Sequence, residues 1–590
     1  MQQAPAPTFR LRAAPAAAEV DRLAAALELP RAVAVLAWQR GLRDAAAWHH
    51  WRESDPARQH DPYLLPDMAL AVDRLRFARE HDQKLLIHGD YDVDGLTGAA
   101  LLRRALRGLG FAAEAFVPHR ERDGYGLSRR ALENAAGAGC SLVVTVDCGS
   151  SEGALIEELA LRGVDTIVTD HHLSTERPEA LAFISPKRPA SRYPYAELCG
   201  SALAYKLARA LHEALGRPLP AETWLDYVAL GTVADVSPLT GENRLLVMAG
   251  LREMSRRLTA RPGSRDDRHP AWRALARAAG LEVGELSAQD LAYRFAPRLN
   301  APGRLGSAQL ALQLLLSDDG EEAIALAGRV EQTNAERRQL EAQVTEAARA
   351  RARERLAQAA GDSRPLGVLA LADAAWPPGL LGISAARLSE EFGRPVILAG
   401  LDALGAARGS GRGPDTPAQD LKALLDACAA SLDRHGGHRR AVGFAVRAGC
   451  WGDFAAALEA AAPPPPAPAP LTADVAVDAG ELDRRFLDAL EQLGPFGEGN
   501  PEPLLLLRDA VPVDSRVLKG QHLRLELALP GGAQLKVMAF GRAGELGARL
   551  HRGLALDLCV RVGRDTYQRA PGEHGLALQL VECAPAGTAG

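Results

Sequence analysis

Residues 85–98 read LLIHGDYDVDGLTG, and this stretch decides the fold of the first half of the chain. An apolar run ends in a cluster of three aspartates, and the following GLTGAALLRRALRGLG has the spacing of a helix. A short apolar strand that ends in polar residues and leads into a helix is typical of a buried parallel sheet. The stretch therefore predicts a strand, an acidic loop and a crossover helix.

The same pattern recurs further along the chain. Short apolar runs again end in polar residues, and helical segments such as EGALIEELALRG separate them: EAFVPHR at 114–120, LVVTVDCGS at 142–150, TIVTDHH at 166–172 and FISPKR at 183–188. Strands that alternate with helices build a doubly wound sheet. We therefore expect an α/β domain over residues 81–245, preceded by a helical cap over residues 1–80 in which apolar residues recur every three or four positions.

The middle of the chain is predicted to be helical from 246 to 358. Its last part, from residue 321 onward, contains no glycine or proline after Gly328. A helix of that length spans about 50–60 Å at 1.5 Å per residue. Because its apolar residues keep no strict heptad, we interpret it as a rigid spacer between two lobes rather than a coiled coil.

Three further parts follow the long helix. Residues 359–461 begin a second α/β pattern, with PLGVLALADA and RPVILAGL as strands, and the APPPPAPAP run at 462–470 predicts a stiff linker. In residues 471–590, segments such as LRLELAL and QLKVMAF alternate with period two. They predict an antiparallel β domain resembling an OB barrel, although aromatic residues for stacking bases are few, Phe540 and Tyr567 among them.

Composition excludes several classes of protein. The 590 residues are 47% apolar and 24% charged, which fits a multi-domain globular protein. No apolar run is long enough to span a membrane and no signal-peptide core is evident, so a cytoplasmic location is expected. The seven scattered cysteines fit neither a disulfide framework nor a zinc finger. With a net charge of −5, contacts to nucleic acid need local basic clusters.

Acidic and imidazole groups stand at four predicted strand ends. Because the carboxyl ends of parallel strands meet at one edge of a sheet, we expect these groups to converge: Asp90, Asp92, Asp94, Asp147, Asp170, His171, His172 and Asp235. Three carboxylates within five residues repel one another unless cations lie among them. Mixed carboxylate and imidazole ligands suit Mn²⁺ or Mg²⁺, and the excess of carboxylates indicates two ions. The predicted chemistry is hydrolysis at phosphorus.

Each motif alone has a simpler interpretation. A single D-x-D is more often a solvated turn, and a single D-H-H a surface loop. Their combination at consecutive strand ends favours the metal site. Asp90 is expected only to orient its neighbours.

These motifs also resemble those of a known family. HGDYDVDGLTG, VDCGSS, TDHH and GTVADVSPL are similar to the four motifs of the DHH phosphoesterase superfamily, in the form carried by its RecJ exonucleases. The resemblance extends over nearly the whole chain, with matching order and spacing, through LLPDMALAV, RFAPRLNAPGRLG, GSGR, GGHRRAVGF and LGPFGEGNPEP. It implies two α/β lobes, a DHH domain and a DHH-associated domain, joined by the long helix and followed by the barrel.

The resemblance implies roles for individual residues. The metal ligands would be Asp92, Asp94, Asp147, His171 and Asp235, with His88 as a further ligand. His172 would lie near the scissile phosphate, so that His172 and Asp147 are the expected catalytic residues.

A second set of residues is expected to bind the phosphates of the substrate: Arg304, Ser410, Arg412, Gly436, Gly437 and His438. Paired glycines allow close approach of the backbone, and Arg439 and Arg440 add charge, although an ordinary β-turn has the same pattern. Arg304 and Arg412 are predicted to lie in glycine-containing loops and to present bidentate donors. Surface salt bridges are the alternative for these two arginines.

One position departs from the family pattern. RecJ proteins usually carry W-H-x-G where this chain has Trp376-Pro377-Pro378-Gly379. Proline has no side chain that donates or binds a metal, so no role is expected for residue 377.

The function implied by the resemblance is degradation of single-stranded DNA to mononucleotides from the 5′ end, in DNA repair and recombination. It needs two Mn²⁺ or Mg²⁺ ions, and the implied partners of a monomeric enzyme are single-strand-binding protein and a RecQ-type helicase. One alternative is a small-molecule or oligonucleotide DHH phosphoesterase, which needs no β domain after a proline-rich linker. The other is a catalytically inactive DNA-binding scaffold, against which the complete set of ligands argues.

Overall fold

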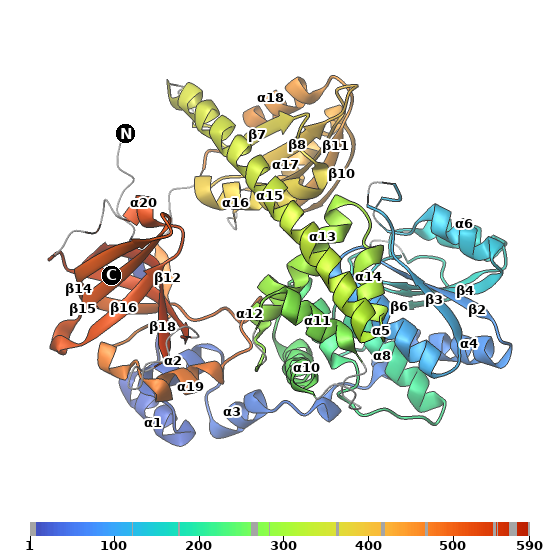
Figure 1. Ribbon diagram of the computed structural model, residues 1–590, viewed down its shortest axis with the longest axis horizontal. Coiled ribbons are helices and arrows are strands. Elements are labelled where there is room, and N and C mark those ends of the chain that lie inside the picture. Colours follow the sequence, from blue (N-terminus) through green and yellow to red (C-terminus); the bar gives the residue numbers. More distant parts are fainter. Residues whose placement is uncertain are drawn as a thin grey trace.

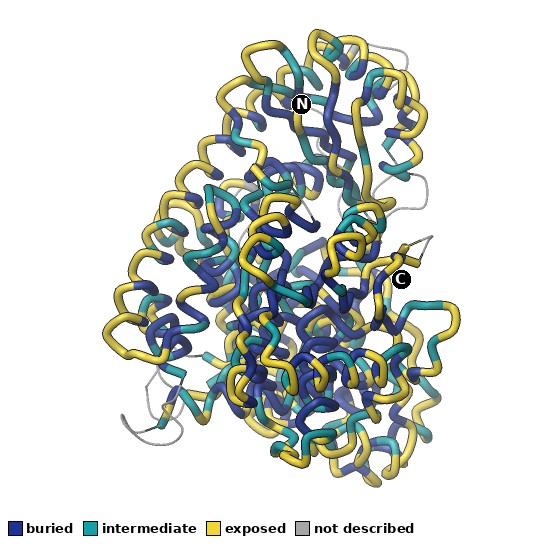
Figure 2. The backbone as a smooth tube through the Cα atoms, turned by 90° about the vertical axis from the view of Figure 1, so that its right-hand side faces the viewer, coloured by how far each residue is buried: buried dark blue, intermediate teal, exposed yellow. Residues whose placement is uncertain are grey.

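Residues 8–120, 122–124, 126–174, 177–260, 269–281, 284–361, 365–414, 419–465, 470–546, 550, 553–565 and 575–587 are described by the computed structural model. The 39-residue helix α15 (Gly320–Gln358) joins two α/β lobes, and a β-barrel lies to one side (Figure 1). Buried residues concentrate in the interior of the lobes (Figure 2). No described helix has the length and apolar character to cross a membrane.

The first lobe contains the predicted parallel sheet. Its strand order is β3-β2-β4-β5-β6, formed by β2 (Lys84–Gly89), β3 (Ala112–Phe116), β4 (Cys140–Val146), β5 (Asp165–Thr169) and β6 (Ala182–Ile184). Side chains alternate between the two faces, as the period of a strand requires. Leu85 and Ile87 pack on one face against α4 (Met68–Glu80), α5 (Val93–Gly108) and α8 (Gly200–Ala214). Leu86 faces α6 (Arg129–Gly137) and α7 (Gly153–Leu161) on the other.

The region after this sheet is helical, as predicted. It comprises α9 (Leu225–Ala234), α10 (Gly241–Thr259), α11 (Pro270–Ala278), α12 (Ala288–Asp290), a π-helical turn (Leu291–Phe295), α13 (Ala296–Leu305) and α14 (Gln309–Leu316). The first part of α15 packs on the core of this region through Leu326 and Val330. Its last part packs on the second lobe through Val344, Ala348 and Ala352. The helix therefore belongs to both cores.

The second lobe is the predicted second α/β unit. Its sheet has the order β10-β11-β9-β8-β7, from β7 (Leu369–Asp373), β8 (Val396–Leu401), β9 (Ala407–Arg412), β10 (Leu432–His438) and β11 (Ala441–Val446). Only β7 and β8 are parallel; the other neighbours are antiparallel. Its helices are α16 (Pro378–Phe392), α17 (Leu421–Ala427) and α18 (Trp451–Ala461).

The last part of the chain forms a closed five-stranded barrel, which confirms the OB-like prediction. The strands are β14 (Leu505–Leu518), β15 (His522–Ala528), β16 (Gln534–Ala539), β17 (Leu556–Arg564) and β18 (Leu576–Pro585), and pairing of β14 with β17 closes the circle. Phe540 is 55% exposed beside the ring of His522. Tyr567 and residues 466–469 of the expected linker lie outside the described residues.

The expected N-terminal cap does not form one unit. Helices α1 (Ala17–Leu27), α2 (Arg31–Gln39) and α3 (Ala45–Arg52) share a core with α19 (Arg484–Glu491) and the barrel, whereas α4 packs on the first sheet. β1 (Phe9–Leu11) pairs in parallel with β12 (Leu471–Ala473), so the N-terminal strand lies against the segment that leads into the barrel (Figure 1). Helical periodicity shows that one face is buried, but it does not show which partner buries it.

Candidate active site

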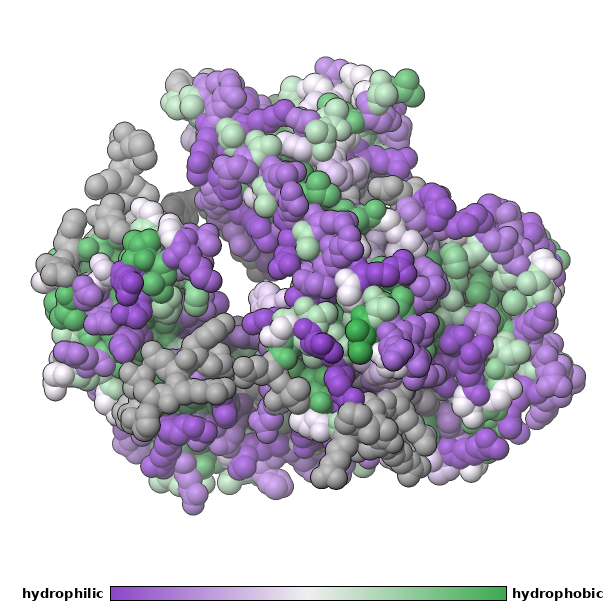
Figure 3. All heavy atoms as spheres, viewed as in Figure 1, coloured by the Kyte–Doolittle hydropathy of each residue, from purple (hydrophilic) through white to green (hydrophobic). Residues whose placement is uncertain are grey.

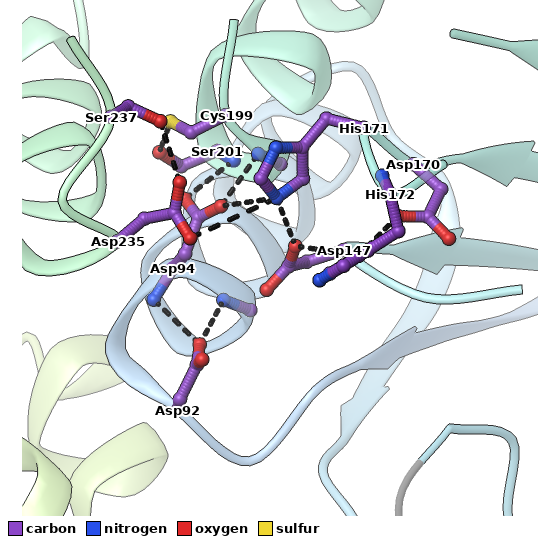
Figure 4. A network of polar contacts seen from close by, with 12 residues as sticks. Asp92, Asp94, Asp147, Asp170, His171, His172, Cys199, Ser201, Asp235 and Ser237 are labelled. Atoms are coloured by element: carbon purple, nitrogen blue, oxygen red, sulfur yellow. Dashed lines mark hydrogen bonds and ion pairs between the residues drawn. The ribbon is translucent and has the colours of Figure 1, made fainter. Parts of the chain in front are cut away.

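The predicted strand-end residues converge at the carboxyl edge of the first sheet. Asp90 follows β2, Asp147 follows β4, and Asp170 and His171 follow β5. The prediction that Asp235 follows a strand is wrong, because Asp235 ends the helix α9. Asp92 caps α5, where its side chain accepts hydrogen bonds from the backbone N–H groups of Asp94 and Gly95. Figure 4 shows Asp94, Asp147 and Asp235 pointing toward His171.

Carboxylate oxygens and ring nitrogens form overlapping groups at this edge. Within each group the potential ligand atoms lie within 4.8 Å of one another: Asp94, His171 and Asp235; Asp90, Asp92 and Asp147; and Asp147, His171 and His172. His171 Nε2 lies 3.0 Å from Asp147 Oδ1 and 3.9 Å from both Asp94 Oδ2 and Asp235 Oδ1. Since Asp147 and His171 belong to more than one group, the arrangement suits two adjacent cations.

Burial makes this acidic edge unfavourable without cations. Burial and the neighbouring carboxylates, Asp94 first, raise the pKa of Asp147 well above its usual value and the pKa of Asp235 to about 8. Within the described part of the chain, Asp147 Oδ1, His171 Nε2 and Asp90 Oδ1 are buried and make no hydrogen bond. Hard oxygens with imidazole are the donors that Mn²⁺ and Mg²⁺ accept. The residues present therefore fit divalent cations.

The start of α8 holds the carboxylate of Asp94. The backbone N–H of Gly200 donates to Asp94 Oδ2 at 2.5 Å, and the N–H of Ser201 donates to Oδ1 at 2.9 Å. A Cβ on Gly200 would lie 2.5 Å from the Cβ of Asp147. Sequence reasoning missed Gly200 and Ser201; the Gly-Ser pair at the start of an apolar helix is the signal that could have identified them.

His172 is oriented by the carboxylate before it. Its Nδ1 donates to Asp170 Oδ1 at 2.8 Å. Burial lowers the pKa of His172, but this hydrogen bond and the charges of Asp170, Asp235 and Asp90 outweigh burial and raise the pKa to about 9. The side chain is 43% exposed. A cationic imidazole thus borders the metal-binding groups, as expected for a residue near a phosphate.

His88 lies apart from the potential ligand groups, so its expected role as a ligand stays a prediction. Its side chain points to the face of the sheet that carries α6, beside Phe116, and the backbone N–H of Ser128 donates to its Nε2 at 3.1 Å. Burial lowers the pKa of His88 to about 4. Among the described residues, His88 belongs to none of the potential ligand groups, whereas Asp90, expected only to orient its neighbours, does. The physical reason is that His88 shares the strand face of Leu86, whereas Asp90 lies beyond the end of β2 at Gly89.

Arg304 and Arg120 lie close to the acidic loop, and Arg412 lies near Arg120. Arg304 is in the last turn of α13 and Arg412 is the last residue of β9, so the prediction that both lie in loops is wrong. Burial and the charges of Arg120 and Arg337 lower the pKa of Arg304 to about 10; burial and Arg120 lower that of Arg412. Arg120, which follows β3, lies over the ring of Tyr91 at 5.3 Å. It was missed, although its place after a strand matched the other site residues.

The remaining expected phosphate contacts lie on the second sheet. Gly443 of β11 pairs with Ser410 on one side and with Gly436 on the other. Gly436, Gly437 and His438 end β10 in an exposed two-residue hairpin. Gly437 has φ +124°, and a Cβ there would lie 2.3 Å from Ala441 O, so only glycine fits. No described contact joins this hairpin to the metal-binding groups, and its role stays a prediction.

Comparison with known proteins agrees with this geometry. Residues 84–232 match the DHH family, N-terminal domain, and residues 473–572 match the RecJ OB domain. The chain is 33% identical to the single-stranded-DNA-specific exonuclease RecJ of Bacillus subtilis, over 90% of this chain and 65% of that protein. It is 37% identical to RecJ of Thermus thermophilus, over 88% of this chain and 72% of the relative.

A solved structure shows the same arrangement of domains. The chain is similar to the crystal structure of RecJ from Thermus thermophilus in complex with Mn²⁺, with a TM-score of 0.79 and 32% sequence identity. The match covers 98% of this chain and 79% of that structure's chain. Fold, strand-end motifs and barrel all agree with these relatives, and we conclude that the chain belongs to the RecJ family.

Proposed function

We propose that this chain is a metal-dependent exonuclease that hydrolyses single-stranded DNA from the 5′ end to mononucleotides, in DNA repair and recombination. The observation that carries the proposal is the set of buried carboxylates and histidines that share Asp147 and His171. The relatives named above are single-stranded-DNA-specific exonucleases, which supports the choice of substrate.

Two Mn²⁺ or Mg²⁺ ions are the proposed cofactors. Asp94, His171 and Asp235 would hold one ion and Asp90 and Asp92 the other, with Asp147 between them. A bound pair of such ions lowers the pKa of a water molecule and stabilises the charge on the phosphoryl group. The proposed set of ligands therefore includes Asp90 and does not include His88.

The chain's own residues orient the substrate. His172, held by Asp170, would donate a hydrogen bond from its cationic ring to an oxygen of the scissile phosphate. Arg120, Arg304 and Arg412 would bind the terminal 5′-phosphate, together with Ser410 and the hairpin residues Gly436, Gly437 and His438. Such a contact sets the register of cleavage, because it fixes the distance from the strand end to the metal-binding groups.

The 5′ polarity is tested with one oligonucleotide labelled at either end, a circular control and a blunt duplex. We expect the 5′ label to leave early as a mononucleotide, and the circle and the duplex to remain intact. A circle that is cut rapidly contradicts the end requirement. If the 3′ label is released first as a mononucleotide, while the 5′ label stays on a series of progressively shorter strands, the proposed polarity is contradicted.

The barrel is proposed to hold the strand beyond the active site. Because α1–α3 share its core, the matched truncation removes residues 1–53 together with 470–590. We expect weaker binding of long strands and a flatter salt dependence, measured by fluorescence anisotropy, while very short oligonucleotides are still cleaved. Unchanged affinity in a folded truncation would show that the barrel has another role.

Single-strand-binding protein, a RecQ-type helicase, a monomeric state and a cytoplasmic location are proposed from family membership. A DHH phosphoesterase acting on small molecules is the second candidate. The closed barrel argues against it, because hydrolysis of a small phosphoester needs no second binding domain.

A further inference from the structure

A buried carboxylate on α15 holds two arginines from different helices. Glu341 is 1% exposed, and Arg337, one turn earlier on α15, donates to its Oε2. Arg387 of α16 places its Nη2 2.7 Å from Glu341 Oε1. Arg337 also donates to Asn334 Oδ1 at 2.9 Å. One carboxylate between two guanidinium groups leaves a net positive charge at a fixed position.

Arg337 lines a groove that passes close to the active site, where Ser237 donates a hydrogen bond to Asp235. The groove, of about 620 Å³, is lined by Ser237 next to Asp235, by Arg304 and Arg337, and by Phe496 ahead of the barrel. Ile383 of α16 lines the same groove, and Arg387 is four residues further on the same face of that helix. Figure 3 shows an open space between the barrel and the second lobe, bordered by hydrophilic side chains.

Arg337 is not fully satisfied by the protein groups around it. Among the described residues, Arg337 Nε is buried without a hydrogen-bond partner. Burial lowers the pKa of Arg337, and the neighbouring charges of Arg338 and Arg387 lower it further. The charge of Glu341 raises the pKa of Arg337 but does not outweigh these effects. Arg337 in turn lowers the pKa of Arg304. Glu341 offsets part of this positive charge, and Glu498 and Glu502 also line the groove, so the net positive charge is confined to the part formed by Arg304, Arg337 and Arg387.

We propose that Arg337 and Arg387, positioned by Glu341, form a second phosphate-binding site for the DNA backbone, in the groove that leads from the metal-binding groups toward the barrel. The site binds an internal phosphodiester of the strand and not the scissile phosphate. Glu341 is a positioning residue, because it acts through the two arginines. This inference rests on the proposed exonuclease function.

The test compares Arg337→Gln, Arg387→Gln and Glu341→Gln in the full-length enzyme with Mn²⁺. Steady-state rates are measured on 5′-phosphorylated strands of increasing length and at several salt concentrations. On long strands, Arg337→Gln should raise KM about tenfold with kcat within about twofold, since a charge-assisted contact is lost outside the reacting centre. The slope of log KM against log salt should fall by about 0.7 per lost phosphate contact. On dinucleotides neither constant should change.

Glu341→Gln separates positioning from simple charge. The substitution removes a negative charge from the groove, so an electrostatic effect alone predicts tighter binding of DNA. A positioning role predicts a higher KM, and no further increase when Glu341→Gln is combined with Arg337→Gln. Arg353→Gln is the matched control, because Arg353 is on the same helix, 64% exposed and paired with Glu391.

The outcomes are distinguishable. A wild-type enzyme that does not degrade single-stranded DNA overturns the proposed function. An active wild type with unchanged KM and salt slope in both arginine variants overturns only this site, as does tighter binding by Glu341→Gln. If thermal melting shows that Arg337→Gln does not fold, Arg387→Gln decides the question, because that side chain is 59% exposed and its loss leaves the core intact.

Discussion

Replacing Asp147 with asparagine lowers the turnover of single-stranded DNA by about a thousandfold or more, the scale expected for loss of a central catalytic group. Asp147 belongs to two of the potential ligand groups, so its loss affects both proposed ions. Asparagine is the better first choice, since residue 147 has φ +63° and asparagine tolerates this region. Asp147→Ala should give the same loss, while binding of DNA largely survives in both variants.

Three measurements check this result: single-turnover cleavage, DNA binding and metal dependence. Chelation should abolish activity of the wild type, and added Mn²⁺ or Mg²⁺ should restore it. Asp165→Asn is the matched control, because Asp165 begins β5 at the opposite end of the strand and pairs with Arg74. Wild-type rates in Asp147→Asn, or in the chelated enzyme, would contradict the metal assignment.

Replacing Gly200 with alanine should lower kcat by about a hundredfold or more, on the scale at which small displacements of catalytic groups act. The added Cβ would lie 2.5 Å from the Cβ and 2.9 Å from the Cα of Asp147. The same residue donates its N–H to Asp94, so the change displaces two proposed ligands together. We expect a higher metal concentration for half-maximal activity, with DNA affinity little changed.

Gly108→Ala is the matched control for this substitution. Gly108 ends α5, and an added Cβ would meet no atom within 4 Å. This variant should keep wild-type activity and be slightly more stable, because alanine favours helix over glycine. Metal titration with thermal melting separates a displaced ligand from a general loss of fold. If Gly200→Ala keeps a normal kcat and a normal metal dependence, the backbone at this edge of the sheet moves to accommodate the added Cβ without displacing the ligands.

The sequence by itself determined the doubly wound sheet, the long helix, the barrel and most members of the site. The reason is local: three of the four motifs stand directly after a strand, and parallel strands place their carboxyl ends at one edge. Asp92, Asp94, Asp147 and His171 could therefore be placed together without knowledge of the packing, whereas Asp235 reaches the site from the end of the helix α9. Period-two alternation likewise located the barrel strands β15 and β16 to within one residue at each end, because one face of each strand is buried.

Only the tertiary structure decided which way individual side chains point and which surfaces meet. His88 and Asp90 are two residues apart, yet His88 packs against α6 and Asp90 joins a ligand group. Helices α1–α3 bury their apolar faces on a barrel that lies more than 400 residues later in the sequence. The hydrogen bond from the side chain of Gln39 to the backbone oxygen of Asp474 likewise joins residues 435 positions apart. The arginines that line the groove come from α13, α15 and β17. Local pattern fixes the element and its buried face, whereas side-chain direction and long-range contacts depend on how the elements pack.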